Sequence, residues 1–432
     1  MLNPTEAGIT KLSRLTNIQY ESMKVLLVGD SPTVNTGFSR CTRAACDELH
    51  NSGHLVTVLG MGYYGDPHLF PYPIYPCVSP YDKAKSYGGE TRLAVMIERI
   101  KPDIVVILQD PWNIQGYFDQ LDDVKTLCDN DNIPFTVPPV VGWMAVDSCN
   151  QKGEPLNRLY HIIVWTQFAI DQLQKGGYRG DYSIIPLGVD TNLFHPYDQL
   201  ESRKEILGEV NPLIPLDAYI VGVVGRNQPR KRLDLTLVYF SEWVHQYKVS
   251  DAYLFLHVAP TGERGCDLRS LITYYGLKGR VLLSEPPVGT GNDESIMPRI
   301  YSCFDLFMTQ SQGEGWHLPT LEAMACGVPC LVPNHSVFGD GGWTGDAVYK
   351  VDCSATALTA PLNGHPYTVG SIPDKVDTID WLQYLYKDEQ VRKANIEKGL
   401  QLAGVLTWDS TGRKLRTVLE KIHVKNLESI LV

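Results

Sequence analysis

Short runs of apolar residues recur along the chain, and longer segments of mixed polarity separate them. Such runs are typical of strands that are buried on both faces of a parallel sheet, and the intervening segments are long enough for crossover helices. The runs form two series: 24–30, 53–59, 101–110, 140–147, 161–166 and 182–190, then 219–226, 253–259, 280–284, 304–308, 328–332 and 347–352. This pattern predicts an α/β protein with two mostly parallel sheets.

The two series of apolar runs, together with the length of the chain, predict two domains. A chain of 432 residues is too long for one ordinary hydrophobic core. Between the two series, residues 197–216 are charged and contain proline, as linkers often do. Residues 376–401 and 408–422 are expected to be helical. The expected organisation is an N-terminal extension (1–22), a first domain (23–205), a second domain (206–385) and C-terminal helices (386–432).

The composition is typical of a globular protein with an acidic surface. The formal net charge is −11 and the pI is ≈ 5.5, which argues against broad binding to nucleic acid or to anionic membranes. The ten cysteines are scattered without metal-ligand spacing, and several lie in apolar runs, as reduced thiols do. No stretch reaches the roughly 18 apolar residues of a membrane span, and the polar N-terminus lacks the apolar core of a signal peptide. We expect a cytoplasmic protein with no integral membrane association and no metal site.

The most informative stretch is residues 313–327, Gly-Glu-Gly-Trp-His-Leu-Pro-Thr-Leu-Glu-Ala-Met-Ala-Cys-Gly, which predicts a loop running into a short helix. Pro319 suits the first helical position, and Gly327 suits the position just past the helix. The helix N-terminus then opens at the carboxyl edge of a sheet, where its free N–H groups suit a phosphate. Two carboxylates, Glu314 and Glu322, would repel that phosphate unless they face hydroxyl groups. A nucleotide-sugar, which has both phosphates and sugar hydroxyls, satisfies both conditions.

This stretch resembles the E-x7-E motif of retaining GT-B glycosyltransferases, the family 4-like "glycosyl transferases group 1". The family form is E-G-F-G-L-P followed by E-A-M-A-x-G-x-P. The positions in register with it are Glu314, Gly315, Leu318, Pro319, Glu322, Ala323, Met324, Ala325, Gly327 and Pro329. His317 departs from the pattern, because the family usually has glycine there. The resemblance implies a GT-B fold, in which two Rossmann-like domains face a central cleft. The first domain would bind the acceptor and the second the nucleotide-sugar donor.

The resemblance also implies roles for the residues of this motif. Glu322 would hold the donor ribose hydroxyls, and Glu314 would hold the hexose hydroxyls. The donor-binding backbone amides would belong to Trp316, His317, Leu318, Thr320 and Leu321. The His317 ring could touch the hexose or the β-phosphate, or it could pack beneath the loop.

A second motif follows the run at 219–226. The family form V-G-R-x4-K is present, with Arg226 and Lys231 at its cationic positions. The leaving group would be a nucleoside diphosphate, whose developing negative charge needs fixed cations, so neither a metal ion nor a cofactor is required. In a front-face reaction with retention, the leaving phosphate can take the acceptor proton, and Glu314 need not be a covalent nucleophile. The neighbouring Arg230 and Arg232 are expected to be solvated, with contact to the phosphate or the acceptor as the less favoured alternative.

In the first domain, the candidate residues follow the predicted strands. Gly37 and Arg40 lie in a polar turn after the first strand. The resemblance implies that this turn approaches the donor phosphate or the acceptor. The alternative is that the turn only caps a helix. Asp110 follows a later strand and is a further candidate for the acceptor side. Asp147 stands where many relatives have a histidine, and it could orient the acceptor hydroxyl, accept its proton or cap a helix. The Tyr-rich segment 63–89 could stack on sugars or bases, or pack locally.

The sequence leaves the sugar, the base and the acceptor open. A glycan, a protein or a small molecule is the expected hydroxyl acceptor. A modified nucleic-acid base is a less favoured alternative, because the basic run 230–232 is short. A GT-B nucleotide-sugar epimerase is disfavoured because such enzymes lack both motifs. A silent nucleotide-sugar-binding module is disfavoured because both carboxylates and both cations are present.

Overall fold

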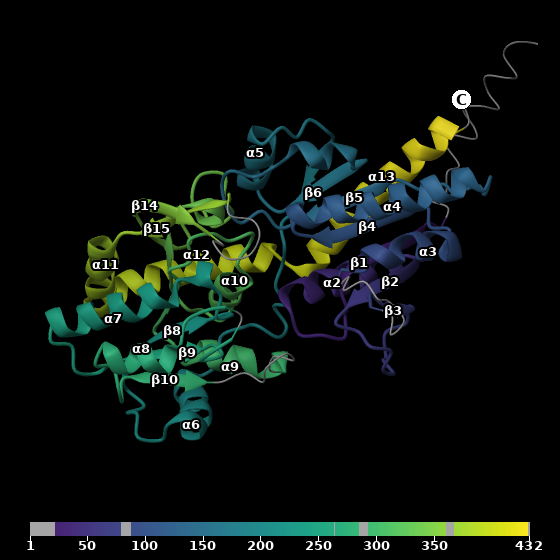
Figure 1. Cartoon of the computed structure of the whole chain (residues 1–432). Helices are drawn as coiled ribbons and strands as arrows, with labels where there is room; N and C mark the ends of the chain where they lie inside the picture. The colour runs from purple at the N-terminus through teal and green to yellow at the C-terminus, as the bar shows by residue number, and fades with distance from the viewer. Residues whose placement is uncertain (1–21, 79–87, 263, 285–292, 360–366, 431–432) are drawn as a thin grey trace, which may run out of the picture.

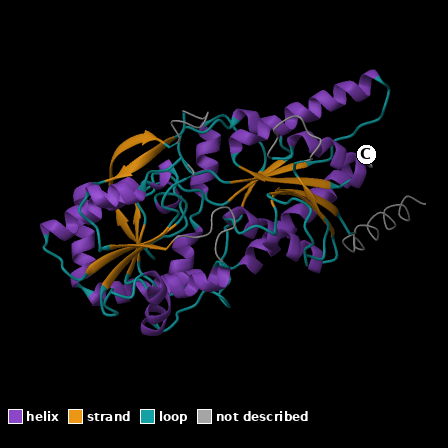
Figure 2. Ribbon diagram, turned by 60° about the horizontal axis from the view of Figure 1, so that its bottom comes forward, coloured by secondary structure: helices purple, strands orange, loops and turns teal. Residues whose placement is uncertain are grey.

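The chain folds into two lobes, each built around its own sheet (Figure 1). The structure is a computed structural model, and it describes residues 22–78, 88–262, 264–284, 293–359 and 367–430. Figure 2 shows the two main sheets as separate layers, each with helices on both faces. Among the described residues, no helix is long and apolar enough to cross a membrane.

The N-terminal lobe contains a seven-stranded sheet in which all neighbouring strands are parallel. In spatial order its strands are β3 (Ile74–Pro76), β2 (Leu55–Met61), β1 (Lys24–Asp30), β4 (Ile104–Gln109), β5 (Val140–Met144), β6 (His161–Val164) and β7 (Tyr182–Ile184). Its helices are α2 (Gly37–Asn51), α3 (Glu90–Ile100), α4 (Ile114–Asn130) and α5 (Gln167–Lys175), with short 3-10 turns at Pro111–Asn113 and Glu154–Arg158. All six residues of β4 are buried, because helices cover both faces of the sheet.

The C-terminal lobe contains a six-stranded parallel sheet. In spatial order its strands are β10 (Val281–Ser284), β9 (Ala252–His257), β8 (Tyr219–Val224), β11 (Leu306–Met308), β12 (Cys330–Pro333) and β13 (Tyr349–Val351). Its helices are α7 (Leu233–Gln246), α8 (Leu268–Tyr274), α9 (Met297–Ser302) and α10 (Leu318–Ala325). The short 3-10 turns are η3 (Pro229–Lys231), η4 (Glu294–Ile296) and η5 (Ser336–Phe338). The predicted α/β class with two mostly parallel sheets is confirmed.

The segment expected to be a linker, 197–216, is instead largely helical. Helix α6 (Gln199–Val210) begins at Asp198, whose carboxylate accepts the backbone N–H of Glu201 at 2.8 Å. Its Arg203 donates to Asp305 at 2.7 Å, so the helix lies against the C-terminal lobe. The charged residues that suggested a linker cover the exposed side of a helix whose Ile206 and Leu207 are buried.

The sequence also failed to predict a small hairpin after β13. Strand β14 (Cys353–Leu358) pairs antiparallel with β15 (Val369–Pro373). The run 347–352 was expected to be the last strand, and β14 escaped detection because its residues are mostly small or polar and largely exposed. The hairpin side of the lobe reaches the N-terminal lobe, since Cys149 and Val369 exchange backbone hydrogen bonds of 2.9 and 3.2 Å.

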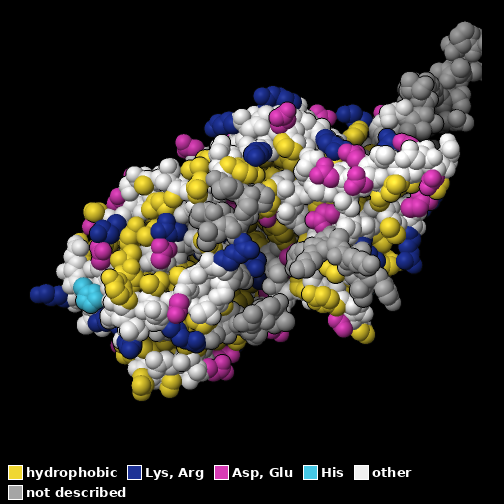
Figure 3. Space-filling model, in the orientation of Figure 1, with side chains coloured by type: hydrophobic (Ala, Val, Ile, Leu, Met, Phe, Trp, Pro, Cys, Tyr) yellow, Lys and Arg dark blue, Asp and Glu magenta, His cyan; other side chains and the backbone are white. Residues whose placement is uncertain are grey.

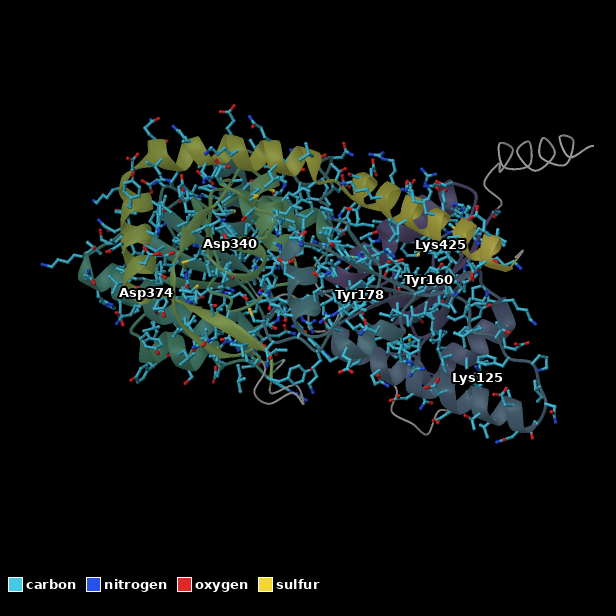
Figure 4. All side chains as sticks on the ribbon, turned by 90° about the horizontal axis from the view of Figure 1, so that it is seen from above. Lys125, Tyr160, Tyr178, Asp340, Asp374 and Lys425 are labelled. Carbon is cyan, nitrogen blue, oxygen red and sulfur yellow. The ribbon has the colours of Figure 1, made fainter. Side chains whose placement is uncertain are left out.

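The C-terminal helices connect the two lobes. The segment 376–401, expected to be helical, consists of two helices: α11 (Lys375–Lys387) ends where Asp388 caps α12 (Glu389–Val405). Helix α13 (Trp408–Ile430) then packs along α2 of the N-terminal lobe, where Leu415 and Leu419 are fully buried. In Figure 4 the labelled Lys425 of α13 lies near Tyr160, and the Lys425 Nζ is 5.9 Å from the centre of that ring.

Candidate active site between the two domains

The loop between β11 and α10 lies where the two lobes meet. Pro319 occupies the first turn of α10, and Gly327 follows the helix with a left-handed φ of 74°, as the sequence predicted. Residues from both domains press on this loop. A Cβ added to Gly313 would lie 2.4 Å from the carbonyl oxygen of Asp147, and one added to Gly37 would lie 3.4 Å from Leu318 Cδ1. The distance at Gly37 is an ordinary van der Waals contact, so α2 and α10 lie against each other there.

Glu314 is buried and is held by residues of its own domain. Its carboxylate pairs with Lys231 Nζ at 2.6 Å and with Arg230 Nη1 at 2.8 Å, and it accepts the Ser311 hydroxyl at 2.6 Å. Burial alone would raise the pKa of Glu314, but Arg230 and Lys231 hold it well below its usual value. Glu314 is therefore ionised, and it can accept hydrogen bonds but not donate a proton.

Lys231 and Arg230 lie side by side on the η3 turn. Burial lowers the pKa of Lys231 to about 8, although the neighbouring Glu314 favours the charged form. Arg230 was expected to be solvated, and that expectation is wrong. Its guanidinium bridges the domains, with Nη1 on Glu314 and Nε 3.5 Å from Asp147 Oδ2. The sequence could not show this, because Asp147 belongs to the other domain.

Glu322 is equally buried but is held across the domain boundary. Arg40, from α2 of the N-terminal lobe, pairs with Glu322 Oε1 through Nη1. The Tyr301 hydroxyl donates to Glu322 Oε2 at 2.6 Å. The Nε of Arg40 lies 2.9 Å from Glu294 Oε1 on η4. Both oxygens of Glu322 therefore have partners, and one of those partners comes from the opposite domain.

Three carboxylates follow adjacent strands of the N-terminal sheet. Asp30 ends β1, Asp110 follows β4 and Asp147 comes soon after β5, and these strands are neighbours. Burial raises the pKa of Asp110 to about 7, with a further contribution from the negative charge of Asp147. Burial also raises the pKa of Asp30, while its hydrogen bond from Thr36 and the nearby Arg226 of the other domain oppose the rise. The structure thus brings Arg226, Asp110 and Asp147 to one region.

His317 packs beneath the loop instead of projecting from it. Its side chain is 1% exposed, its ring lies against Phe307 and Phe338, and its Nδ1 is 2.6 Å from Thr320 Oγ1. Burial lowers the pKa of His317 to about 3, so the ring is neutral at physiological pH. Its φ of 68° is in the left-handed region, which explains why glycine is usual at this position.

The other predicted donor-binding residues turn their side chains away from solvent. Trp316 stacks on Trp343 with ring centres 4.6 Å apart, and its carbonyl accepts the Trp343 indole N–H at 2.7 Å. The side chains of Leu318, Thr320 and Leu321 are buried as well. The role expected for the backbone amides of this segment stays a prediction.

Part of the Tyr-rich segment packs locally. Tyr63 donates to the Asp66 carbonyl at 2.7 Å, and Tyr72 donates to Asp47 at 2.9 Å. Both rings are buried, whereas Tyr64 is 79% exposed. Residues 79–87 lie outside the described part of the chain, so the stacking role stays a prediction.

Several residues of the site were missed by sequence reasoning: Asp30, Arg230, Glu294, Tyr301 and Ser311. Asp30 could have been found, because it ends a strand at the same sheet edge as Asp147. Ser311 is three residues from its partner Glu314, but a lone serine there is not a distinctive signal, and the remaining three have partners that are distant in the sequence. Tyr301 is 21 residues from Glu322, and Arg230 is more than 80 residues from Glu314.

A comparison with models of protein families finds a match within the C-terminal domain. Residues 218–359 match the model described as Glycosyl transferases group 1. Solved structures with the same arrangement of two domains include the sucrose-phosphate synthase of Thermosynechococcus elongatus, with a TM-score of 0.69 at 14% identity over 94% of this chain and 100% of that one. The chain has the GT-B fold, and residues 218–359 are similar to the group 1 glycosyl transferases. Anabaena HepE, solved with UDP-glucose, superposes with a TM-score of 0.65 at 14% identity, covering 92% of this GT-B chain and all of that one.

Curated relatives match mainly over part of their length. The D-inositol 3-phosphate glycosyltransferase of Acidothermus cellulolyticus is 29% identical over 153 residues, which are 34% of this chain and 32% of the relative. A UDP-Gal:alpha-D-GlcNAc-diphosphoundecaprenol alpha-1,3-galactosyltransferase of Escherichia coli is 32% identical over 157 residues, or 35% and 36% of the two chains. The chain thus spans about a third of the length of these relatives.

Proposed function

We propose that this GT-B protein transfers a sugar, with retention at the anomeric carbon, from a nucleoside-diphosphate-sugar to a hydroxyl acceptor. The observation that carries the proposal is the pair of buried carboxylates where the domains meet: Glu314 in the loop before α10, and Glu322 within α10. Both are only 3% exposed, and they stand four residues before the first residue of α10 and four residues after it. Such a site can meet phosphate with backbone N–H groups and sugar hydroxyls with carboxylates.

The proposed donor pose follows the family resemblance. Glu322 accepts from the ribose hydroxyls, and Glu314 accepts from the hexose hydroxyls. The relation to structures such as HepE, which was solved with UDP-glucose, supports UDP-sugars as the first donors to test. Because Glu314 already holds Lys231 and Arg230, the hexose would bind beside two cations. Those cations, together with Arg226, are then close to the diphosphate that leaves.

The proposed chemistry needs no covalent intermediate. The acceptor oxygen bonds to the anomeric carbon on the face from which the phosphate oxygen departs, and the acceptor proton passes to the leaving phosphate. The cations offset the charge that develops on the diphosphate, which is the largest electrostatic demand of the step. With a pKa of about 8, Lys231 is mostly charged at pH 7 and can serve in this way. We accordingly propose a metal-independent reaction.

Asp147 is the proposed contact with the acceptor. It lies 3.5 Å from Arg230, which itself contacts Glu314, so it is close to the proposed transfer point. In this role it orients the acceptor hydroxyl. A glycan, a protein or a small molecule in the cytoplasm is the proposed class of acceptor. Positive and negative side chains are interspersed over the face shown in Figure 3, which offers little support for a nucleic-acid acceptor.

The test is a thermal-shift panel of UDP-, GDP- and ADP-sugars, with release of nucleoside diphosphate measured in the same samples. A ligand that binds only the folded state raises the melting temperature by mass action. The proposal predicts a shift with one nucleotide, slow release of that nucleotide from its sugar, and loss of both in Glu322→Ala. A shift without any release over long incubation would indicate a silent binding module. The absence of any shift would overturn the proposal.

A further inference from the structure

Arg40 covers the carboxylate that the donor would need. Its Nη1 is bonded to Glu322 Oε1, and the Tyr301 hydroxyl bonds to Oε2 at 2.6 Å. The Glu322 side chain is only 4% exposed in this arrangement. A carboxylate has lone pairs for further hydrogen bonds, but a ribose hydroxyl can reach this one only after the guanidinium moves aside.

The position of Arg40 depends on the closeness of the two domains. Arg40 is the fourth residue of α2, which begins at Gly37. A Cβ at Gly37 would already touch Leu318 of α10. The ion pair thus joins α2 of the N-terminal domain directly to α10 of the C-terminal domain. Opening the cleft would separate this pair, whereas the pair of Lys231 with Glu314 lies within one domain and would remain.

The structure also offers Arg40 another position. Its Nε already lies 2.9 Å from Glu294 Oε1, so the arginine keeps one ionic partner when it leaves Glu322. A cavity of about 360 Å³ lies alongside, and its lining includes Arg40, Glu294, Asp47, Asp190 and Asp409. The lining also includes Glu48 and the cation Arg43, so carboxylates outnumber cations there and make the cavity a favourable place for a displaced guanidinium.

We propose that Arg40 is a donor gate, a positioning residue that occupies the ribose-binding carboxylate and must be displaced before the nucleotide can bind. The inference rests on the proposed function, because it assumes that Glu322 binds the donor ribose. Arg40 competes with the donor, so it lowers the apparent affinity and couples donor binding to the separation of α2 from α10. The opposite alternative is that Arg40 itself binds the donor phosphate, and that role would make Arg40 favourable to binding.

The two roles predict opposite effects of the same substitution. In Arg40→Gln the side chain keeps much of its size but can no longer form the ion pair, so donor binding should tighten. The Arg40 side chain is 21% exposed, and an ion pair with one partner in contact with solvent corresponds to about a fivefold change in the dissociation constant. The KM for the donor should fall by a similar factor, while kcat stays within about twofold, because Arg40 does not touch the reacting atoms.

The experiment is calorimetric titration of UDP, GDP and ADP into the full chain at pH 8, where free carboxylates are ionised. Arg43→Gln is the matched control, because Arg43 lies on the same helix and approaches Glu294 at 3.7 Å. It should bind like the wild type. Arg40→Lys should restore most of the wild-type affinity, since lysine can still pair with Glu322.

The outcomes separate the gate from the proposed function. If the wild type binds none of the nucleotides, the proposed function fails together with the gate. If the wild type binds a nucleotide and Arg40→Gln binds it equally or more weakly, the proposed function stands and the gate is overturned. A melting curve of each variant without ligand identifies any loss of folding.

Discussion

Two carboxylates of the site, one in the loop before α10 and one within α10, are equally buried but have different partners. Glu314 and Glu322 are each 3% exposed. Glu314 is held by Lys231 and Arg230 from the domain to which it belongs, whereas Glu322 is held by Arg40 from the opposite domain. A carboxylate paired within one rigid domain is preorganised, and one paired between domains responds to their movement. The hexose end of the site should therefore be fixed, and the ribose end should be adjustable.

The largest expected effect is a loss of turnover when the contacts of Glu314, at the hexose end of the site, are removed. Lys231→Ala removes the 2.6 Å partner of Glu314 and one of the cations proposed to stabilise the leaving diphosphate. Losing such a group typically lowers turnover by about 10²–10³-fold. The measurement is the steady-state rate of sugar transfer or donor hydrolysis. Arg232→Ala is the control in the same segment, since Arg232 pairs with Asp234 at 2.8 Å, and it should retain most of the activity. Equal activity of the two variants would contradict the assignment.

A second prediction concerns Asp110, whose pKa is raised by burial and by the negative charge of Asp147. Its folded-state pKa of about 7 exceeds its ordinary value, so the folded chain binds more protons than the unfolded chain between those two values. Stability should accordingly fall as the pH rises through that interval, and Asp110→Asn should abolish this fall. The variant should gain on the order of 2 kcal/mol above pH 7 and nothing near pH 4.

The check on Asp110 is the difference in melting temperature between variant and wild type from pH 4 to pH 8. The exposed Asp123 on α4 provides a control, and Asp123→Asn should follow the wild type at every pH. A pH-independent difference for Asp110→Asn would show that Asp110 does not ionise in the way described.

The smallest effect on donor binding is expected at the ribose end of the site, around Glu322. Tyr301→Phe removes the hydrogen bond to Glu322 Oε2 and leaves the pair with Arg40 in place. Loss of one buried hydrogen bond to a charged group should cost about 1–3 kcal/mol of stability. The Arg40 contact is untouched, so the competition with the donor should persist. Denaturant titration and donor binding measure the two effects separately. A loss of donor binding greater than tenfold would assign Tyr301 to the ligand instead.

Sequence reasoning succeeded where the signal is local. Apolar runs predicted strands such as β4 and β8, and the spacing of Pro319 and Gly327 predicted α10. It failed at α6 and β14, where a charged surface or a run of small residues hides the element. Packing against distant segments, not the local pattern, specifies both.

The same distinction applies to the candidate site. The spacing of Glu314 and Glu322 is visible in the chain, and so is the cationic position of Lys231. The partner of Glu322 is not, because Arg40 and Glu322 are 282 residues apart and meet only when the domains come together. Arg230 was misjudged for the same reason. A run of three basic residues, 230–232, cannot reveal which of them faces a carboxylate on the other domain.

The most direct test of the account compares the binding of a nucleoside diphosphate with that of its sugar in two variants. UDP and UDP-glucose, or the pair chosen by the thermal-shift panel, are titrated into wild type, Glu314→Gln and Glu322→Gln. The account predicts that Glu322→Gln weakens both ligands by a similar factor, because both carry the ribose. It predicts that Glu314→Gln weakens only the sugar-bearing ligand. If Glu314→Gln weakened both ligands equally, or if Glu322→Gln left the binding of both unchanged, the assignment of the hexose to Glu314 and the ribose to Glu322 would be contradicted.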